Sequence, residues 1–123
     1  METEISTAIR GQISEAEVIC SELSVTVGEY HQAIEALWTH AMAETGERRP
    51  ASLVLLGAYD PPNWAITFSD LASLDYKLLK AALVVLRGRL VLGIEPHTMM
   101  RNGSNRLRQL MEEVFSCYTQ ATQ

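Results

Sequence analysis

Two histidine–carboxylate pairs are the first candidates for chemistry, because their spacing places each pair on one face of a helix. His31 and Glu35, and likewise His40 and Glu44, are four residues apart, and such neighbours can present two ligands to a metal ion. The two pairs are about 2.5 helical turns from each other, so they face opposite sides. The chain also lacks the HExxH and ExxH motifs of zinc and di-iron sites on helices. We therefore expect no metal and no cofactor, and both pairs are interpreted as exposed.

Nucleophilic catalysis needs a nucleophile, a base and an orienting group held together. Cys20 and Cys117 are candidate nucleophiles, but neither lies in a nucleophile elbow, and the seven glycines do not cluster into a phosphate-binding loop. Asp70 fits better as a helix-capping acid, and Asp60 as a turn former before two prolines. We assign no catalytic residue, and an enzyme with an unrecognised site stays the second alternative function.

The elements that would position these side chains are helices. Ser14 with Glu17, and Thr67 with Asp70, match the capping box that opens a helix. Helices are therefore predicted to begin near residues 14 and 67, and Ser104 or Asn105 is expected to cap the last one. The longer helices are predicted over 14–44, 67–92 and 104–120.

The first of these helices carries one continuous apolar seam with alternating spacings of three and four. Its members are Ala16, Cys20, Leu23, Val27, Tyr30, Ile34, Leu37 and Ala41. This seam is expected to pack along its whole length. The stretch Ser24–Gly28 lowers helix propensity, so a break near Gly28 is predicted. Because an unbroken 14–44 helix would be about 46 Å long against about 26 Å for the last helix, either that break occurs or a second subunit covers the remainder. A homodimer is the expected oligomer.

The second helix is apolar on two faces. One face carries Leu71, Leu74, Leu78, Ala81, Val85, Gly88 and Leu92. A neighbouring face carries Leu79, Leu83, Leu86 and Leu90. A helix of this kind is expected to be buried between partners, so 67–92 is the predicted central helix, and Gly93 with Pro96 is its predicted end.

Short helical segments are predicted over 50–57 and 96–102, the first from an early Pro50 and a late Gly57. The alternation of Trp64, Ile66 and Phe68 instead permits a small hairpin over 53–68. The predicted fold class is an all-α bundle of three longer helices plus short segments. The alternative is an α+β fold containing that hairpin.

Residues 86–108 resemble the helix-turn-helix of phage-repressor-like regulators. Gly93 and Ile94 match its turn, and a reading helix would begin at Pro96. The resemblance implies a DNA-binding regulator. Its candidate contacts with bases and phosphates are His97, Thr98, Arg101, Asn102, Arg106 and Arg108.

Two positions depart from that pattern. Arg89 stands where the motif wants a small residue at the helix crossing, and Asn102 stands where it wants an apolar one. We therefore favour a connector between packing helices over a reading motif, with DNA as a disfavoured partner.

Trp64 lies beside Pro61 and Pro62. Together they could form an aromatic–proline ridge that contacts a partner protein. Anchoring of this loop in the core by the indole is the favoured interpretation, because large aromatic side chains usually contribute their area to packing.

Composition predicts one globular domain over 1–123, frayed at residues 1–12. The longest apolar run, Leu53–Tyr59, is far shorter than the roughly 18 residues of a membrane span, so no membrane contact is expected. Residues 1–47 hold nine acids and one base, and residues 48–123 hold six acids and nine bases. This asymmetry is expected to be satisfied mainly within the fold.

Apolar helical seams without a catalytic constellation indicate a small cytosolic helical protein. Its expected role is a non-enzymatic protein-interaction or accessory regulatory module with an unidentified protein partner. Such a module should expose an apolar patch or groove.

Overall fold

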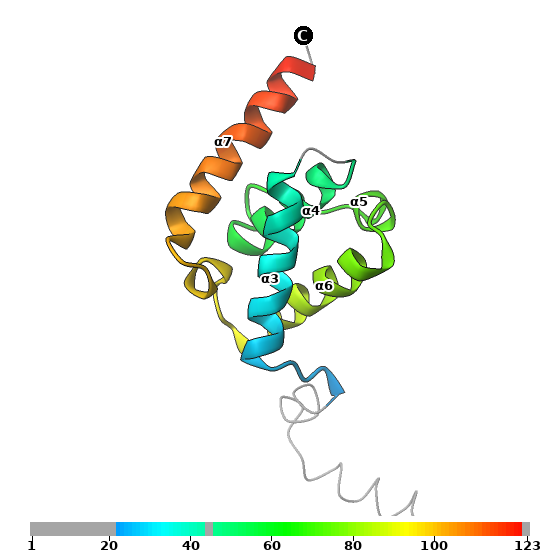
Figure 1. Ribbon diagram of the computed structural model, residues 1–123, viewed down its shortest axis with the longest axis vertical. Coiled ribbons are helices and arrows are strands. Elements are labelled where there is room, and N and C mark those ends of the chain that lie inside the picture. Colours follow the sequence, from blue (N-terminus) through cyan, green and yellow to red (C-terminus); the bar gives the residue numbers. More distant parts are fainter. Residues whose placement is uncertain (1–21, 44–45, 122–123) are drawn as a thin grey trace, which may run out of the picture.

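Every regular element in the described part of the chain is helical. The computed structural model describes residues 22–43 and 46–121, with side chains described up to residue 116. The elements are α3 (Val27–Met42), α4 (Arg48–Tyr59), α5 (Phe68–Ala72), α6 (Tyr76–Arg87), the π-helical turn η1 (Gly88–Leu92), the 3-10 turn η2 (Pro96–Met99) and α7 (Gly103–Ala121). The all-α prediction is confirmed, and the alternative with a hairpin over 53–68 is wrong (Figure 1).

Helix α3 begins at a capping box that the helix prediction overlooked. Thr26 Oγ1 accepts a hydrogen bond from the Glu29 amide at 3.0 Å, and Glu29 Oε1 accepts one from the Thr26 amide at 2.9 Å. The backbone of Thr26 is extended, with φ −86° and ψ 157°, so no helix runs through it. The segment predicted over 14–44 is therefore not one helix, and the break predicted near Gly28 is found at Thr26, just before it. The Ser14–Glu17 box lies outside the described residues.

The predicted helix over 67–92 is three consecutive elements. The Thr67–Asp70 capping box is confirmed, with the Asp70 amide donating to Thr67 Oγ1 at 3.1 Å, but α5 ends after five residues. Asp75 then caps α6, because its carboxylate accepts a hydrogen bond from the Leu78 amide at 2.8 Å. The prediction of one helix over 67–92 is wrong. The apolar residues keep helical spacing across the break at Ser73–Asp75, so their pattern does not reveal it.

Helix α4 lies where a shorter helix was predicted over 50–57. It is followed by a tight turn in which Asp60 O accepts hydrogen bonds from the amides of Asn63 and Trp64, both at 3.1 Å. The Asn63 side chain also donates to the Asp60 carboxylate, at 3.0 and 3.2 Å. Residues 64–67 are non-helical and pair with no strand in the described chain.

The core is built around α4, not around the segment 67–92. Every side chain of α4 from Ala51 to Leu56 is buried, and α4 contacts α3, α6 and α7. Helix α3 contributes its predicted seam from Tyr30 onward. The identification of 67–92 as the central helix is therefore wrong: α6 buries only one of its two apolar faces, through Leu78, Ala82 and Val85.

A close contact joins α3 to the carboxyl end of α6. Tyr30 is fully buried, and its ring lies so close to Gly88 that any β-carbon there would overlap it, with 2.7 Å to Cε1. The Tyr30 hydroxyl donates a hydrogen bond to the Ile94 carbonyl at 2.7 Å. The helical run ends as predicted at Gly93, whose φ of 70° is left-handed, a conformation that glycine adopts without steric cost.

Helix α7 starts one residue before its predicted start, so Ser104 and Asn105 lie inside its first turn rather than at its cap. Gly103 packs directly against the backbone of His97. Asn102 precedes the helix with a left-handed φ of 56°. In Figure 1 the carboxyl end of α7 projects beyond the other helices.

Candidate interaction surface

The predicted reading helix over 96–102 is a single 3-10 turn, Pro96–Met99. Thr98 Oγ1 donates to the Glu95 carbonyl at 2.6 Å. Asn102 Oδ1 accepts a hydrogen bond from the Asn105 side chain at 2.9 Å. These two side chains hydrogen-bond within local turns, and both the connector and the DNA-reading interpretation stay predictions.

Arg106 joins α7 to α3. Its guanidinium lies over the Trp38 ring at 4.4 Å, and Nη2 lies 3.9 Å from Glu35 Oε2. Nη1 donates to the Arg101 carbonyl at 3.0 Å. Of the three arginines predicted to meet nucleic acid, Arg101 and Arg108 are the exposed ones.

His97 is half-buried where η2 meets α4. Its ring meets Tyr59 edge-on, with centroids 5.2 Å apart and planes at 71°. Its Nδ1 atom is buried and has no hydrogen-bond partner among the residues that the structure describes. The side chain packs inward and contributes to the core contact between these elements.

Pro61 and Pro62 are exposed in the turn after α4, whereas Trp64 is half-buried and packs against the core. The three residues therefore do not form one exposed ridge. The indole anchors the segment, and the prolines are what the turn presents to solvent.

Arg89 and Arg48 each connect the end of one helix to another element, a role that no local sequence pattern predicts. Arg89 Nε donates to the Ala58 carbonyl in the last turn of α4 at 3.0 Å, and its Nη2 lies 3.0 Å from Glu95. Arg48 Nε donates to the Ala41 carbonyl in the last turn of α3 at 3.2 Å, and its Nη2 lies 3.1 Å from Glu113. Each guanidinium satisfies a carbonyl that has no partner within its own helix.

The histidine–carboxylate pairs gather no further ligands. His31 Nε2 lies 4.0 Å from Glu35 Oε1, and His40 Nδ1 contacts the Ala36 carbonyl at 3.1 Å. Glu44 lies outside the described residues. Across residues 22–43 and 46–121, no three His, Cys, Asp or Glu side chains come together as a metal site requires. The same residues contain no helix that is both long and apolar enough to cross a membrane.

Within the described residues, the second face of α6 is an exposed apolar feature. We define the α6 stripe as Tyr76, Leu79, Leu83, Leu86 and Leu90. Tyr76, Leu83 and Leu90 keep 79%, 46% and 77% of their surface exposed. Leu79 and Leu86 are half-buried. The spacings of three and four place these side chains along one side of the helix, and the stripe continues into η1.

Helix α5 extends this apolar surface. Phe68 is 91% exposed, and with Ile66, Leu71 and Leu86 it lines a shallow pocket of about 190 Å³. The pocket therefore connects α5 to the α6 stripe. Monomeric proteins rarely leave a contiguous apolar surface of this kind uncovered.

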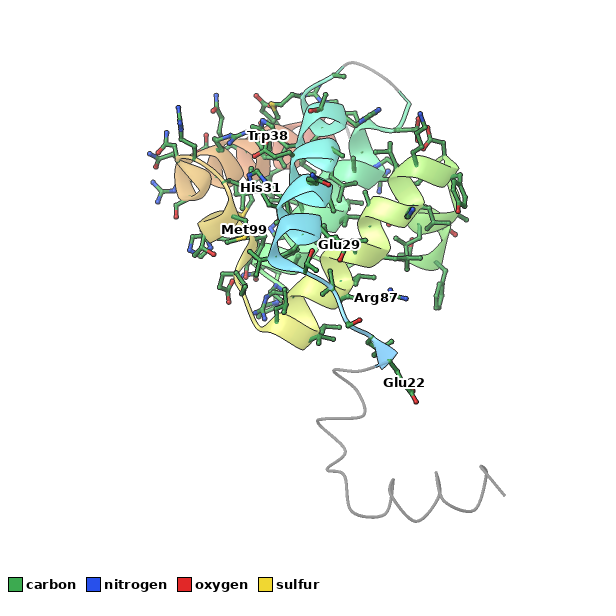
Figure 2. All side chains as sticks on the ribbon, turned by 60° about the horizontal axis from the view of Figure 1, so that its bottom comes forward. Glu22, Glu29, His31, Trp38, Arg87 and Met99 are labelled. Carbon is green, nitrogen blue, oxygen red and sulfur yellow. The ribbon has the colours of Figure 1, made fainter. Side chains whose placement is uncertain are left out.

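One edge of the stripe is positively charged. Lys77, Lys80 and Arg87 are all exposed on α6, and we call them the basic flank. Glu29, at the start of α3, interacts electrostatically with the basic flank. Hydrogen bonds with Thr26 are the main cause of the lowered pKa of Glu29, and the charges of Lys80 and Arg87 lower it further. Figure 2 shows Glu22, Glu29 and Arg87 on the same side of the molecule.

These features define an all-helical fold whose described helices leave the α6 stripe exposed. The chain belongs to DUF7673, a family of unknown function whose model matches residues 31–114. No curated protein and no solved structure matches the chain. The family match contains the whole α6 stripe and the basic flank, and it begins after the chain has entered α3.

Proposed function

We propose that this domain is a non-enzymatic protein-interaction module that binds an acidic amphipathic helix of another protein along the α6 stripe. The single observation that carries the proposal is the exposure of Tyr76, Leu83 and Leu90 in helical register. A helical partner with apolar residues at the same spacing would bury this row, as in other helix-in-groove complexes. Each large apolar side chain that becomes fully buried contributes about 1.5–3 kcal/mol.

The basic flank determines the charge of the partner. Lys77, Lys80 and Arg87 are exposed, so each ion pair with the partner adds little net affinity. Complementary charge instead speeds association and fixes the orientation of the bound helix. The stripe thus supplies the affinity, and the flank selects an acidic helix over a basic one.

In this proposal the protein acts in the cytosol as an accessory or regulatory subunit. Homodimerisation is a separate prediction, which light scattering on the purified protein tests. The DNA-binding alternative also stays a prediction. If Arg101 reads DNA, Arg101→Ala reduces DNA binding with the fold intact, and unchanged binding contradicts that alternative.

Affinity capture from the native lysate tests the proposed function. The tagged wild-type protein is compared with the Leu83→Asp/Leu90→Asp double variant, in the presence of nuclease. Gln109→Asp is the matched control, because it adds the same charged side chain at an exposed position of α7. We expect a stoichiometric protein partner that the wild type and the control retain and the double variant loses. Equal retention by all three proteins would contradict the proposal.

A further inference from the structure

The chain carries its own candidate ligand for the α6 stripe. Upstream of the described residues, Ile9, Ile13, Ala16 and Cys20 follow one another at spacings of four, three and four. Ala16 and Cys20 lie on the seam of the helix predicted from residue 14, and Ile9 and Ile13 continue its spacing upstream of that start. The spacing is the same alternation that runs along the α6 stripe. The inference that follows rests on the proposed function of that stripe.

Charge favours the same pairing. Residues 9–20 contain two acids, Glu15 and Glu17, and one base, Arg10, a net charge of −1, and three further acids, Glu2, Glu4 and Glu22, flank them. The basic flank of α6 carries three positive charges. In an antiparallel pair of two α6 stripes, by contrast, the basic flanks of both copies would lie on the same side and repel each other. The acidic segment is therefore a better match for this face than a second α6.

The position at which the segment joins the domain also favours it. Glu22 is the first described residue, and Leu23 and Val27 remain 42% and 49% exposed. Ser24–Thr26 are non-helical and lead into α3. Glu29, in the first turn of α3, interacts electrostatically with Lys80 and Arg87. The described chain therefore begins on the side of the molecule that carries Glu22, Glu29 and Arg87 (Figure 2).

The length of the segment and its short connection to α3 are compatible with a contact within one chain. The helix predicted from Ser14 would rise about 9 Å to Cys20, and residues 9–13 lengthen the segment toward the roughly 21 Å that the stripe spans from Tyr76 to Leu90. A short tether gives the segment an effective concentration on the order of millimolar at the stripe. A weak contact is then enough to occupy the face, and a partner protein that binds more tightly can displace it.

We propose that residues 9–20 bind the α6 stripe of the same chain and compete there with the partner helix. The segment thereby acts as an autoinhibitory ligand. It lies outside the family match at 31–114, so it would regulate this chain while the stripe itself belongs to the part shared with the family model.

Cys20 provides the test, because it lies on the apolar seam of the segment. In full-length protein carrying Cys117→Ser, Cys20 is the single thiol, and its alkylation by iodoacetamide is followed by mass spectrometry. We expect alkylation at least about tenfold slower than in a synthetic peptide of residues 9–22, because only the undocked population reacts. Adding Leu83→Asp/Leu90→Asp or Ile13→Asp should restore the rate of the peptide, whereas Gln109→Asp should leave the thiol slow. A wild-type rate equal to that of the peptide overturns the inference.

Protein concentration separates a contact within one chain from an exchange between two. Protection that is independent of concentration supports the intramolecular contact. Protection that disappears on dilution assigns the stripe to the segment of a second copy and overturns the inference as stated.

Failure of this inference is distinguishable from failure of the proposed function. If Cys20 is unprotected while Leu83→Asp/Leu90→Asp still abolishes partner capture, the interaction module stands and the autoinhibitory segment does not. If Cys20 is protected by the stripe but capture does not depend on the stripe, the partner assignment fails instead. Where both hold, Ile13→Asp should increase the amount of partner captured, because it removes the competitor.

Discussion

Helices α4 and α6 are both rich in leucine and valine, yet the fold treats them differently. In α4 every residue from Ala51 to Leu56 is buried, because α3, α6 and α7 surround it. In α6 one face is buried against α3 and α4, while Tyr76, Leu83 and Leu90 stay exposed on the other. Apolar composition therefore predicts that a helix has partners, but not whether those partners belong to the same chain.

Replacing one leucine in each helix by alanine tests this difference between α4 and α6. Leu55 is fully buried, and Leu55→Ala should lower the free energy of unfolding by about 2–5 kcal/mol, because it leaves a cavity. Leu83→Ala should change it by no more than about 0.5 kcal/mol, because nothing in the described chain encloses that side chain. Urea denaturation of both variants measures the difference. A loss for Leu83→Ala as large as that for Leu55→Ala would mean that the described helices enclose this side chain, contrary to its 46% exposure.

The next largest effect concerns the buried face of α6. A methyl group at Gly88 would overlap the Tyr30 ring, so Gly88→Ala should destabilise the protein by about 1–3 kcal/mol through overpacking. Gly46→Ala is the control, because a β-carbon there meets no atom within 4 Å. Thermal unfolding followed by circular dichroism compares the two variants. Equal melting temperatures would show that α6 does not pack on α3 as described.

The hydroxyl of Tyr30 gives a smaller effect and a pH signature. Tyr30→Phe removes its hydrogen bond to the Ile94 carbonyl and should cost about 1 kcal/mol. Burial raises the pKa of Tyr30 to about 12 from its ordinary 10.0. A group whose pKa is raised on folding stabilises the fold fully below its unfolded pKa and loses this contribution as pH rises through its folded pKa. Stability should therefore fall between pH 10 and about 12, by roughly 1.4 kcal/mol per unit.

Urea titrations across that pH range measure the Tyr30 contribution. The same titrations on Tyr30→Phe should show a shallower fall, because the buried titrating group is gone. Identical slopes for the two proteins would contradict the buried, hydrogen-bonded state of this hydroxyl.

The smallest expected effect concerns the packing of α7 against α3. Arg106→Ala removes the contact with Trp38 and the ion pair with Glu35, and should cost about 0.5–1 kcal/mol. Arg108→Ala, at an exposed position on the same helix, should cost less. Fluorescence of the tryptophans during denaturation reports on both variants. The opposite ranking would count against the Arg106–Trp38 contact.

Much of the helical architecture was predictable because its signals are local. The Thr67–Asp70 capping box and the Gly93 stop depend on residues within one turn, and both are confirmed. The Thr26–Glu29 box was equally readable as a Thr-x-x-Glu motif but was overlooked within a long apolar seam. The break at Asp75 was hidden because Leu71, Leu74 and Leu78 keep helical spacing across it.

The candidate surface was harder to predict because it depends on long-range contacts. The second apolar face of α6 was recognised from its spacing, but it was predicted to be buried. The contacts of Tyr30 with Gly88 and Ile94, and of Arg106 with Trp38, join residues far apart in the chain. No local pattern indicates such pairs, so neither the anchoring of Arg106 nor the exposure of the α6 stripe could be derived from the sequence.

Photo-crosslinking from position 83 shows whether the α6 stripe binds a partner protein. A photoreactive amino acid replaces Leu83 in one protein and Gln109 in another, and each is irradiated in native lysate. The account predicts a specific protein adduct from position 83 that is absent from position 109. An adduct from position 109 alone, or the same adducts from both positions, would contradict it.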